Sequence, residues 1–168
     1  MGATSPTELF VYGTLRHDQP EHARYCRGVT GWRRARLRGR LFRLVEGYRL
    51  LVVPPAAILH RATHAPEVDE TARRAIAARD LAQAADARDR AAGTHWIPGE
   101  LLAFADAATA WPPLDRWEGA STHRDSVYVR VVVPVAVDDP ERPLVAAWVY
   151  AASRAPAGAV ELAAPPAD

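Results

Sequence analysis

Asp115 and Glu118, in the stretch LDRWEG, are the residues whose type and spacing best suit proton transfer. They lie three positions apart and therefore on one face of a helical turn. Trp117 supplies apolar surface next to Glu118, and a carboxylate held against an apolar wall has a raised pKa. A group of this kind both accepts and donates protons near neutral pH, so Glu118 is a candidate general acid and base. The competing interpretation is a helix-end carboxylate in water.

The second stretch with chemical potential is FVYGTLR, residues 10–16. It closes the apolar run Glu8 to Tyr12, which predicts a buried strand that enters a tight turn at Gly13. Successive backbone N–H groups in such a turn can converge on a carboxylate or an oxyanion. Strands that end at a glycine turn are common, so this stretch taken alone favours a structural role.

Further strands must position these two stretches. Alternation of Arg34, Arg36, Arg38 and Arg40 with smaller residues predicts a strand with one charged face. Apolar or β-branched runs predict four more, over residues 47–55, 97–104, 128–137 and 144–152. Short helices are expected at residues 20–26 and before Gly119. Because several connections are too short for crossover helices, we expect an α+β fold with a small mixed β-barrel and flanking short helices.

The segment Pro66 to Ala92 is rich in Ala, Arg and acidic residues. Acid-first spacings of four, such as Glu70 to Arg74, and a weak apolar stripe through Val68 and Ile76 predict one long, solvent-facing inserted helix. Residues 1–155 are then expected to form a single domain that contains this insertion. Residues 156–168 are expected to be a flexible C-terminal tail.

Composition excludes several classes of protein. The chain has 168 residues, of which 49% are hydrophobic and 24% charged, and its net charge is +1. This is the size and balance of one globular domain, without the basic excess of a dedicated nucleic-acid or membrane-surface binder. Cys26 stands alone, which excludes a disulfide framework and a cysteine zinc site, and it is interpreted as a small buried hydrophobe. With no apolar run of about 18 residues and no leader pattern, the predicted location is cytoplasmic.

Two remaining clusters are interpreted as structural. The six histidines follow no metal-ligand pattern, and His60 and His64, four apart, lack a glutamate partner, so no metal is predicted. The segment Arg27 to Arg49 contains eight arginines and one acid. A solvated strand face is favoured over a nucleic-acid surface because few aromatic residues are interleaved for base stacking.

Taken together and in order, the motifs resemble the γ-glutamylcyclotransferase-like family, which includes the AIG2-like proteins. The resemblance rests on FVYGTLR followed by QPEH, on PGELLAF and LDRWEG, and on YVRVVVPV and AAWVYAA, and it covers roughly residues 8–152. It implies a small barrel and an enzyme that needs no metal or cofactor. The implied reaction on a small-molecule γ-glutamyl amide is attack of the α-amine on the γ-carbonyl, which releases 5-oxoproline and a free amine.

The resemblance also implies roles for particular residues. Glu118 matches the family's catalytic glutamate, which carries the proton. The substrate-binding loop corresponds to Tyr12, Gly13, Thr14 and Leu15, and aromatic pocket positions correspond to Tyr128 and Tyr150. No Ser or Cys nucleophile is required because the nucleophile lies within the substrate.

Departures from the family pattern leave the substrate open. Glu21 stands where many relatives have Asn, and residues 120–127 and 66–92 are both candidates for a pocket rim. The leaving amine and the oligomeric state therefore stay undetermined. Two alternatives also remain: a non-catalytic small-molecule-binding module on the same fold, and an interaction protein that uses the Arg-rich strand face.

Overall fold

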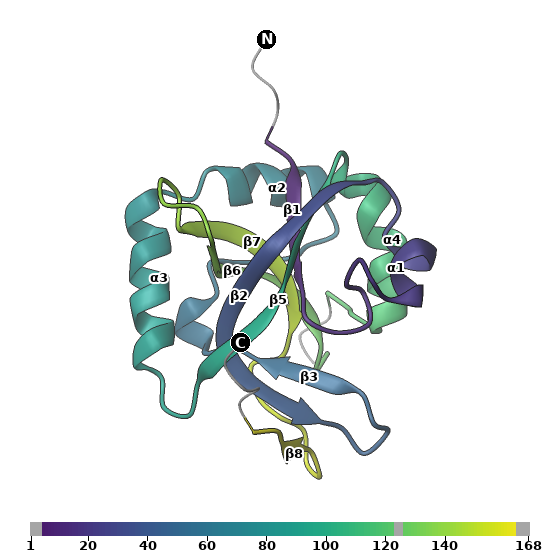
Figure 1. Cartoon of the computed structure of the whole chain (residues 1–168), viewed down its shortest axis with the longest axis vertical. Helices are drawn as coiled ribbons and strands as arrows, with labels where there is room; N and C mark the ends of the chain where they lie inside the picture. Colours follow the sequence, from purple (N-terminus) through teal and green to yellow (C-terminus); the bar gives the residue numbers. More distant parts are fainter. Residues whose placement is uncertain (1–4, 123–125, 164–168) are drawn as a thin grey trace.

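The computed structural model describes residues 5–122 and 126–163, and five strands form a closed ring at its centre. Around the ring the order is β2, β5, β1, β7 and β6, and β6 returns to β2 through Ala35–Val137 and Arg36–Ala136. Only the β1–β7 pair among these is parallel. This confirms the α+β fold with a small mixed barrel (Figure 1). The strands are β1 (Thr7–Val11), β2 (Val29–Arg43), β5 (His95–Phe104), β6 (Val129–Val137) and β7 (Leu144–Ala151).

Strand β6 shows why the barrel wall is apolar on both faces. Successive side chains of a strand point to opposite faces. Val131, Val133 and Val135 join the core inside the barrel, whereas Val132 packs outside it with Trp148 and α4 (Ala107–Glu118). The continuous run of β-branched residues is therefore explained by burial on two sides, as the sequence indicated.

Three short strands extend the ring. β3 (Arg49–Val52) forms a hairpin with the end of β2, and β4 (His60–Arg61) pairs with β6. β8 (Val160–Glu161) pairs with Phe42 and Arg43, and Glu161 binds Arg40 Nη2 at 2.7 Å. This part of the predicted tail therefore has contacts with β2, which offers it a free edge and a counterion; residues 164–168 lie outside the described part.

Helices cover the barrel on opposite sides. α1 (Pro20–Tyr25) and α4 lie on one side and α3 (Ala78–Arg90) on the other, with the 3₁₀ turn η1 (Pro55–Ala57) beside α3 (Figure 1). Asp106 caps α4 by accepting from the N–H groups of Ala108 and Thr109. Gly119 ends it at φ 62°, the left-handed conformation that glycine adopts at least cost.

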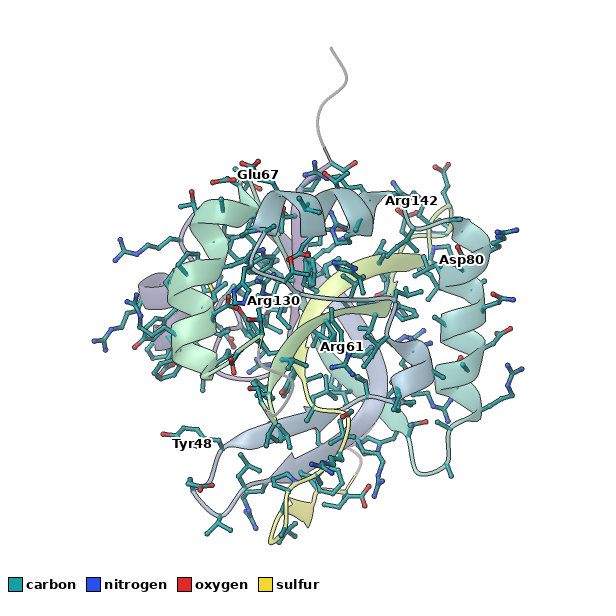
Figure 2. The ribbon with its side chains drawn as sticks, turned by 180° about the vertical axis from the view of Figure 1, so that it is seen from behind. Tyr48, Arg61, Glu67, Asp80, Arg130 and Arg142 are labelled. Carbon is teal, nitrogen blue, oxygen red and sulfur yellow. The ribbon has the colours of Figure 1, made fainter. Side chains whose placement is uncertain are left out.

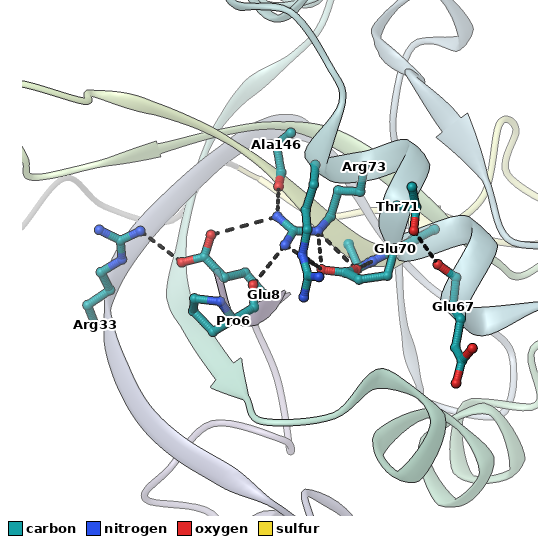
Figure 3. Close-up of polar contacts among 10 residues, drawn as sticks. Pro6, Glu8, Arg33, Glu67, Glu70, Thr71, Arg73 and Ala146 are labelled. Carbon is teal, nitrogen blue, oxygen red and sulfur yellow. Dashed lines mark hydrogen bonds and ion pairs between the residues drawn. The ribbon is translucent and has the colours of Figure 1, made fainter. Parts of the chain in front are cut away.

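The segment predicted as one long inserted helix is two helices, α2 (Pro66–Arg74) and α3, separated at residues 75–77. One face of α2 is buried, with Glu70 and Arg73 paired to each other, while Val68 of the predicted apolar stripe is exposed. Arg73 also donates to the carbonyls of Pro6 and Ala146, as Figure 3 shows. Polar anchors, not an apolar stripe, attach α2 to β1 and β7.

Candidate active site

A cavity of about 880 Å³ opens between the loop that follows β1, the β2–β3 hairpin and the C-terminal end of α4. β1, β5, β7 and the segment before β6 contribute its remaining walls. The structure brings all the predicted site residues to this cavity: Tyr12, Gly13, Thr14, Leu15, Glu118, Tyr128 and Tyr150. Residues more than 100 positions apart in the sequence therefore meet there.

The loop after β1 is held from behind by side chains outside the predicted set. Glu100 Oε2 accepts a hydrogen bond from the backbone N–H of His17 at 2.8 Å, and Oε1 lies 2.6 Å from Nδ1 of the same histidine. The Leu15 carbonyl lies 2.9 Å from His22 Nδ1. A carbonyl only accepts, so His22 must carry its proton on Nδ1.

Backbone N–H groups of this loop are its candidate hydrogen-bond donors to a ligand. Within residues 5–122 and 126–163, the backbone N–H groups of Thr14 and Leu15 form no hydrogen bond with the protein. Unpaired N–H groups that line a cavity are suited to hold a carboxylate or an oxyanion. The substrate-binding role that the resemblance implies for this loop stays a prediction.

Glu118 is the last residue of α4 and lines the cavity beside the turn at Gly119. Burial raises the pKa of Glu118 to about 7. Trp117 was expected to supply the apolar wall, yet its indole is 38% exposed and stacks on Tyr25. The charge of the Glu118 carboxylate raises the pKa of Tyr12, so the two side chains lie near each other. Tyrosines therefore form part of the wall around Glu118.

The three tyrosines form two hydrogen-bonded units. The hydroxyls of Tyr12 and Tyr128 are 2.6 Å apart, and the Leu51 N–H donates to the Tyr12 hydroxyl. Tyr150 donates to Asp115 Oδ1 at 2.6 Å and stacks on Tyr128. Burial raises the pKa of all three phenols, which keeps them protonated and able to donate at neutral pH.

Asp115 does not act in tandem with Glu118, although the two share a helical turn. Its carboxylate accepts from Arg130 Nε at 3.1 Å and Nη2 at 3.3 Å, in addition to Tyr150. Arg130 in turn is buried against Trp111, with its guanidinium carbon 4.1 Å from the ring centroid. Asp115 is therefore engaged by Tyr150 and Arg130, whereas Glu118 is the acid of this turn that lines the cavity.

Residues able to hold a metal are few in the described part of the chain. Donor atoms of His17, Asp18 and Glu100 all lie within 4.8 Å of one another. Both oxygens of Glu100 already contact His17, and these two contacts hold the loop after β1 in place. His60 and His64 form no pair: His60 binds Asp69.

The Arg-rich face of β2 is largely engaged within the protein. Arg36 and Arg38 lie over the ring of Trp96, with guanidinium carbons 4.9 and 6.0 Å from its centroid. Arg33 pairs with Glu8, and Arg40 with Glu161. These contacts favour the structural interpretation of the arginines.

Sequence reasoning missed Glu100, His22 and Arg49 as parts of the site. Glu100 and His22 lay inside two motifs, PGELLAF and QPEH, but neither was assigned a role. Arg49 begins β3 and lines the cavity. Of the proposed rim at residues 120–127, residues 120–122, 126 and 127 are described, whereas 123–125 lie outside the described residues; Val127 alone among these five lines the cavity.

The sequence model of the γ-glutamyl cyclotransferase, AIG2-like family matches residues 9–80 and 80–165. The chain belongs to this family. The match includes the loop after β1, Glu118, Tyr128 just before β6 and Tyr150 of β7, so the cavity lies within the family's shared region.

Structural comparison adds one similar protein. A crystal structure of an AIG2-like protein from Mus musculus has 20% sequence identity, with a TM-score of 0.48 over 91% of this chain and 82% of that chain. Comparison with curated proteins gives no match. Among the described residues of this family member, no helix is both long and apolar enough to cross a membrane.

Proposed function

We propose that the protein is a γ-glutamyl cyclotransferase that releases 5-oxoproline and a free amine from a γ-glutamyl amide. The observation that carries this proposal is Glu118, a half-buried acid with a pKa of about 7, which lines the same cavity as Thr14 and Leu15, whose N–H groups have no hydrogen-bond partner among the described residues. Glu118 transfers the proton, and the N–H groups stabilise the negative charge that develops. Membership of the family supports the reaction class.

The reaction begins with the proton on the substrate's α-ammonium group. An α-amino group has a pKa of about 8, roughly one unit above the pKa of Glu118, so transfer to the Glu118 carboxylate is nearly balanced in free energy. The freed amine then attacks the γ-carbonyl carbon. Positioning these two groups of one substrate is the main task of the cavity.

Attack forms a new N–C bond and places negative charge on the carbonyl oxygen. The N–H groups of Thr14 and Leu15 are the donors that stabilise this oxyanion. As the intermediate collapses, Glu118 returns its proton to the departing nitrogen and the original amide C–N bond breaks. The second proton of the ring nitrogen then passes through the regenerated Glu118 carboxylate to the released amine, which leaves as an ammonium ion. The products are 5-oxoproline and a free amine, and no water is consumed.

The tyrosines keep the cavity in shape for this cycle. Tyr150 donates to Asp115, and both that carboxylate and Glu118 raise the pKa of its phenol. Tyr12 is fixed by the Leu51 N–H. Neutral phenols do not compete for the proton that Glu118 moves.

The test is 5-oxoproline release from a panel of γ-glutamyl amides by the wild type, by Glu118→Gln and by the exposed control Glu141→Gln. We expect release by the wild type and by the control, and a loss of about 10²-fold to 10⁴-fold in Glu118→Gln. Ligand binding that persists in Glu118→Gln, with no turnover by any form, would instead support the non-catalytic binding module.

A further inference from the structure

Asp115 and Arg130 lie next to the candidate active site without lining it. Neither is among the described residues that line the cavity. Arg130 is 4% exposed and lies between α4 and the barrel strands (Figure 2), with its guanidinium carbon 5.0 Å from the ring centroid of the buried Trp148. A buried cation requires a partner of opposite charge, and Asp115 is that partner.

Arg130 fixes the orientation of the Asp115 carboxylate. Its Nε donates to Oδ1 at 3.1 Å and its Nη2 donates to Oδ2 at 3.3 Å, so each carboxylate oxygen accepts one guanidinium N–H. A bidentate pair of this kind holds a carboxylate in one orientation. In that orientation Oδ1 also accepts the hydroxyl of Tyr150 at 2.6 Å.

Tyr150 connects this pair to the cavity. It is the cross-strand partner of Arg130, and it lines the cavity together with Glu118. Its ring stacks on Tyr128 with 6.2 Å between the centroids, and the Tyr128 hydroxyl lies 2.6 Å from that of Tyr12. The position of the Tyr150 phenol therefore affects the other two tyrosines of the cavity.

The hydrogen bond to Asp115 also decides what Tyr150 offers to a bound molecule. A phenol has one proton and an ionised carboxylate can only accept, so Tyr150 donates its proton to Asp115. The Tyr150 oxygen then has only lone pairs for any other contact. Toward a molecule in the cavity, Tyr150 is therefore a hydrogen-bond acceptor and not a donor.

We propose that Asp115 and Arg130 are positioning residues, which act on the reaction in the cavity through the Tyr150 hydroxyl. This inference rests on the proposed function for its kinetic test. It gives the two acids of one helical turn separate tasks. Glu118 moves the proton, and Asp115 holds the phenol that lines the same cavity.

The experiment is a double-mutant cycle on 5-oxoproline release with Tyr150→Phe, Asp115→Asn and the variant that carries both. Tyr150→Phe removes the hydroxyl, leaves the ion pair intact, and should lower kcat/KM about tenfold. Asp115→Asn removes the negative charge and leaves one oxygen to serve both Arg130 and Tyr150, so it should lower kcat/KM about fivefold. The double variant should lie within about twofold of Tyr150→Phe, since both changes act on one hydrogen bond.

Glu70→Gln is the matched control, because Glu70 also pairs with a buried arginine, Arg73, but is not among the described residues of the cavity lining. It should lower the free energy of unfolding, as Asp115→Asn does, and leave kcat/KM within about twofold of the wild type. Urea unfolding of each variant separates a loss of stability from a loss of activity.

A second measurement does not depend on turnover. With its oxygen 2.6 Å from Asp115 Oδ1, the Tyr150 hydroxyl should give a slowly exchanging, downfield proton NMR signal. The signal should be absent from Tyr150→Phe, move upfield in Asp115→Asn and persist in Glu70→Gln.

Three results would overturn the proposal. One is a double variant whose loss of kcat/KM equals the product of the two single losses, because Asp115 then acts independently of Tyr150. Another is full activity of Tyr150→Phe. The third is a wild type without the downfield signal.

Failure of the proposed function is distinguishable from these results, because no form of the protein would then release 5-oxoproline. The same cycle is measured in that case as calorimetric affinity for γ-glutamyl-alanine. A loss of affinity that is not additive supports the positioning role. An additive loss, or no binding by the wild type, overturns it.

Discussion

At the scale of single residues, the raised pKa of Glu118 suits the proposed proton transfer and also costs stability at high pH. Because burial raises its pKa above the unfolded value of about 4.3, the folded state binds the proton more tightly. The contribution of this group to stability is fully present below the unfolded pKa. It is lost as the pH rises through about 7, where the buried carboxylate becomes charged.

Glu118→Gln should therefore be more stable than the wild type at pH 8, by on the order of 2 kcal/mol, and closer to it at pH 4. Urea unfolding at both pH values measures the difference. A stability gap that does not change with pH would contradict the assigned cause of the shift. The same ionisation predicts that kcat/KM of the wild type rises with pH through about 7.

We expect Glu100 to hold the loop after β1 in position. It is 7% exposed and binds both the backbone and the ring of His17, which in turn stacks on Trp32. Glu100→Ala should lower kcat by about 10-fold to 100-fold, because small displacements of the loop misplace the oxyanion donors.

The measurement for Glu100→Ala is a kcat and KM comparison, with circular dichroism to check folding. Glu100→Gln keeps an oxygen for the His17 N–H and should recover part of the lost kcat. If the glutamine variant were no better than alanine in a folded protein, the hydrogen bond to the loop would not be the reason for the loss.

At the scale of elements, the two ends of α4 serve different purposes. Asp106 at the N-terminus stabilises the helix, whereas Gly119 at the C-terminus also sets the direction of the chain beside Glu118. The hydrogen bond from the Ala120 N–H to the Asp115 carbonyl closes that turn.

Asp106→Ala and Gly119→Ala should each cost about 1 kcal/mol, the first through a lost cap and the second through a strained positive φ. Only Gly119→Ala should also lower kcat, since it alone displaces Glu118. Chemical denaturation together with steady-state kinetics separates the two effects. Equal activity losses in both variants would point to helix stability instead of the turn.

At the scale of the whole molecule, Arg73 joins parts of the chain that are distant in sequence. It donates to Pro6 before β1 and to Ala146 in β7, and pairs with Glu70, which also accepts from the Trp148 indole (Figure 3). Removing one member of a buried ion pair leaves the other charge unpaired.

Arg73→Ala should lower the free energy of unfolding by about 3 kcal/mol or more. Arg79→Ala, which breaks the exposed Arg79–Asp80 pair, should change it by less than about 1 kcal/mol. Urea unfolding of both variants makes the comparison. A small effect of Arg73→Ala would mean that α2 is attached mainly by other contacts.

The sequence by itself determined the features that depend on neighbours in the chain. The apolar runs predict the strands, Gly13 and Gly119 mark the turns, and the motifs around Tyr12 and Glu118 predict the site and the family. Local patterns suffice for these because backbone conformation responds to adjacent residues.

Only the tertiary structure decided which charged groups are buried and what they serve. Glu70 meets Trp148 across 78 positions and Glu100 meets His17 across 83, so nothing in the local pattern of either acid reveals its partner. The same holds for Arg49, whose place at the cavity depends on barrel closure. Burial of a charge requires a specific partner, and that partner is supplied by the fold.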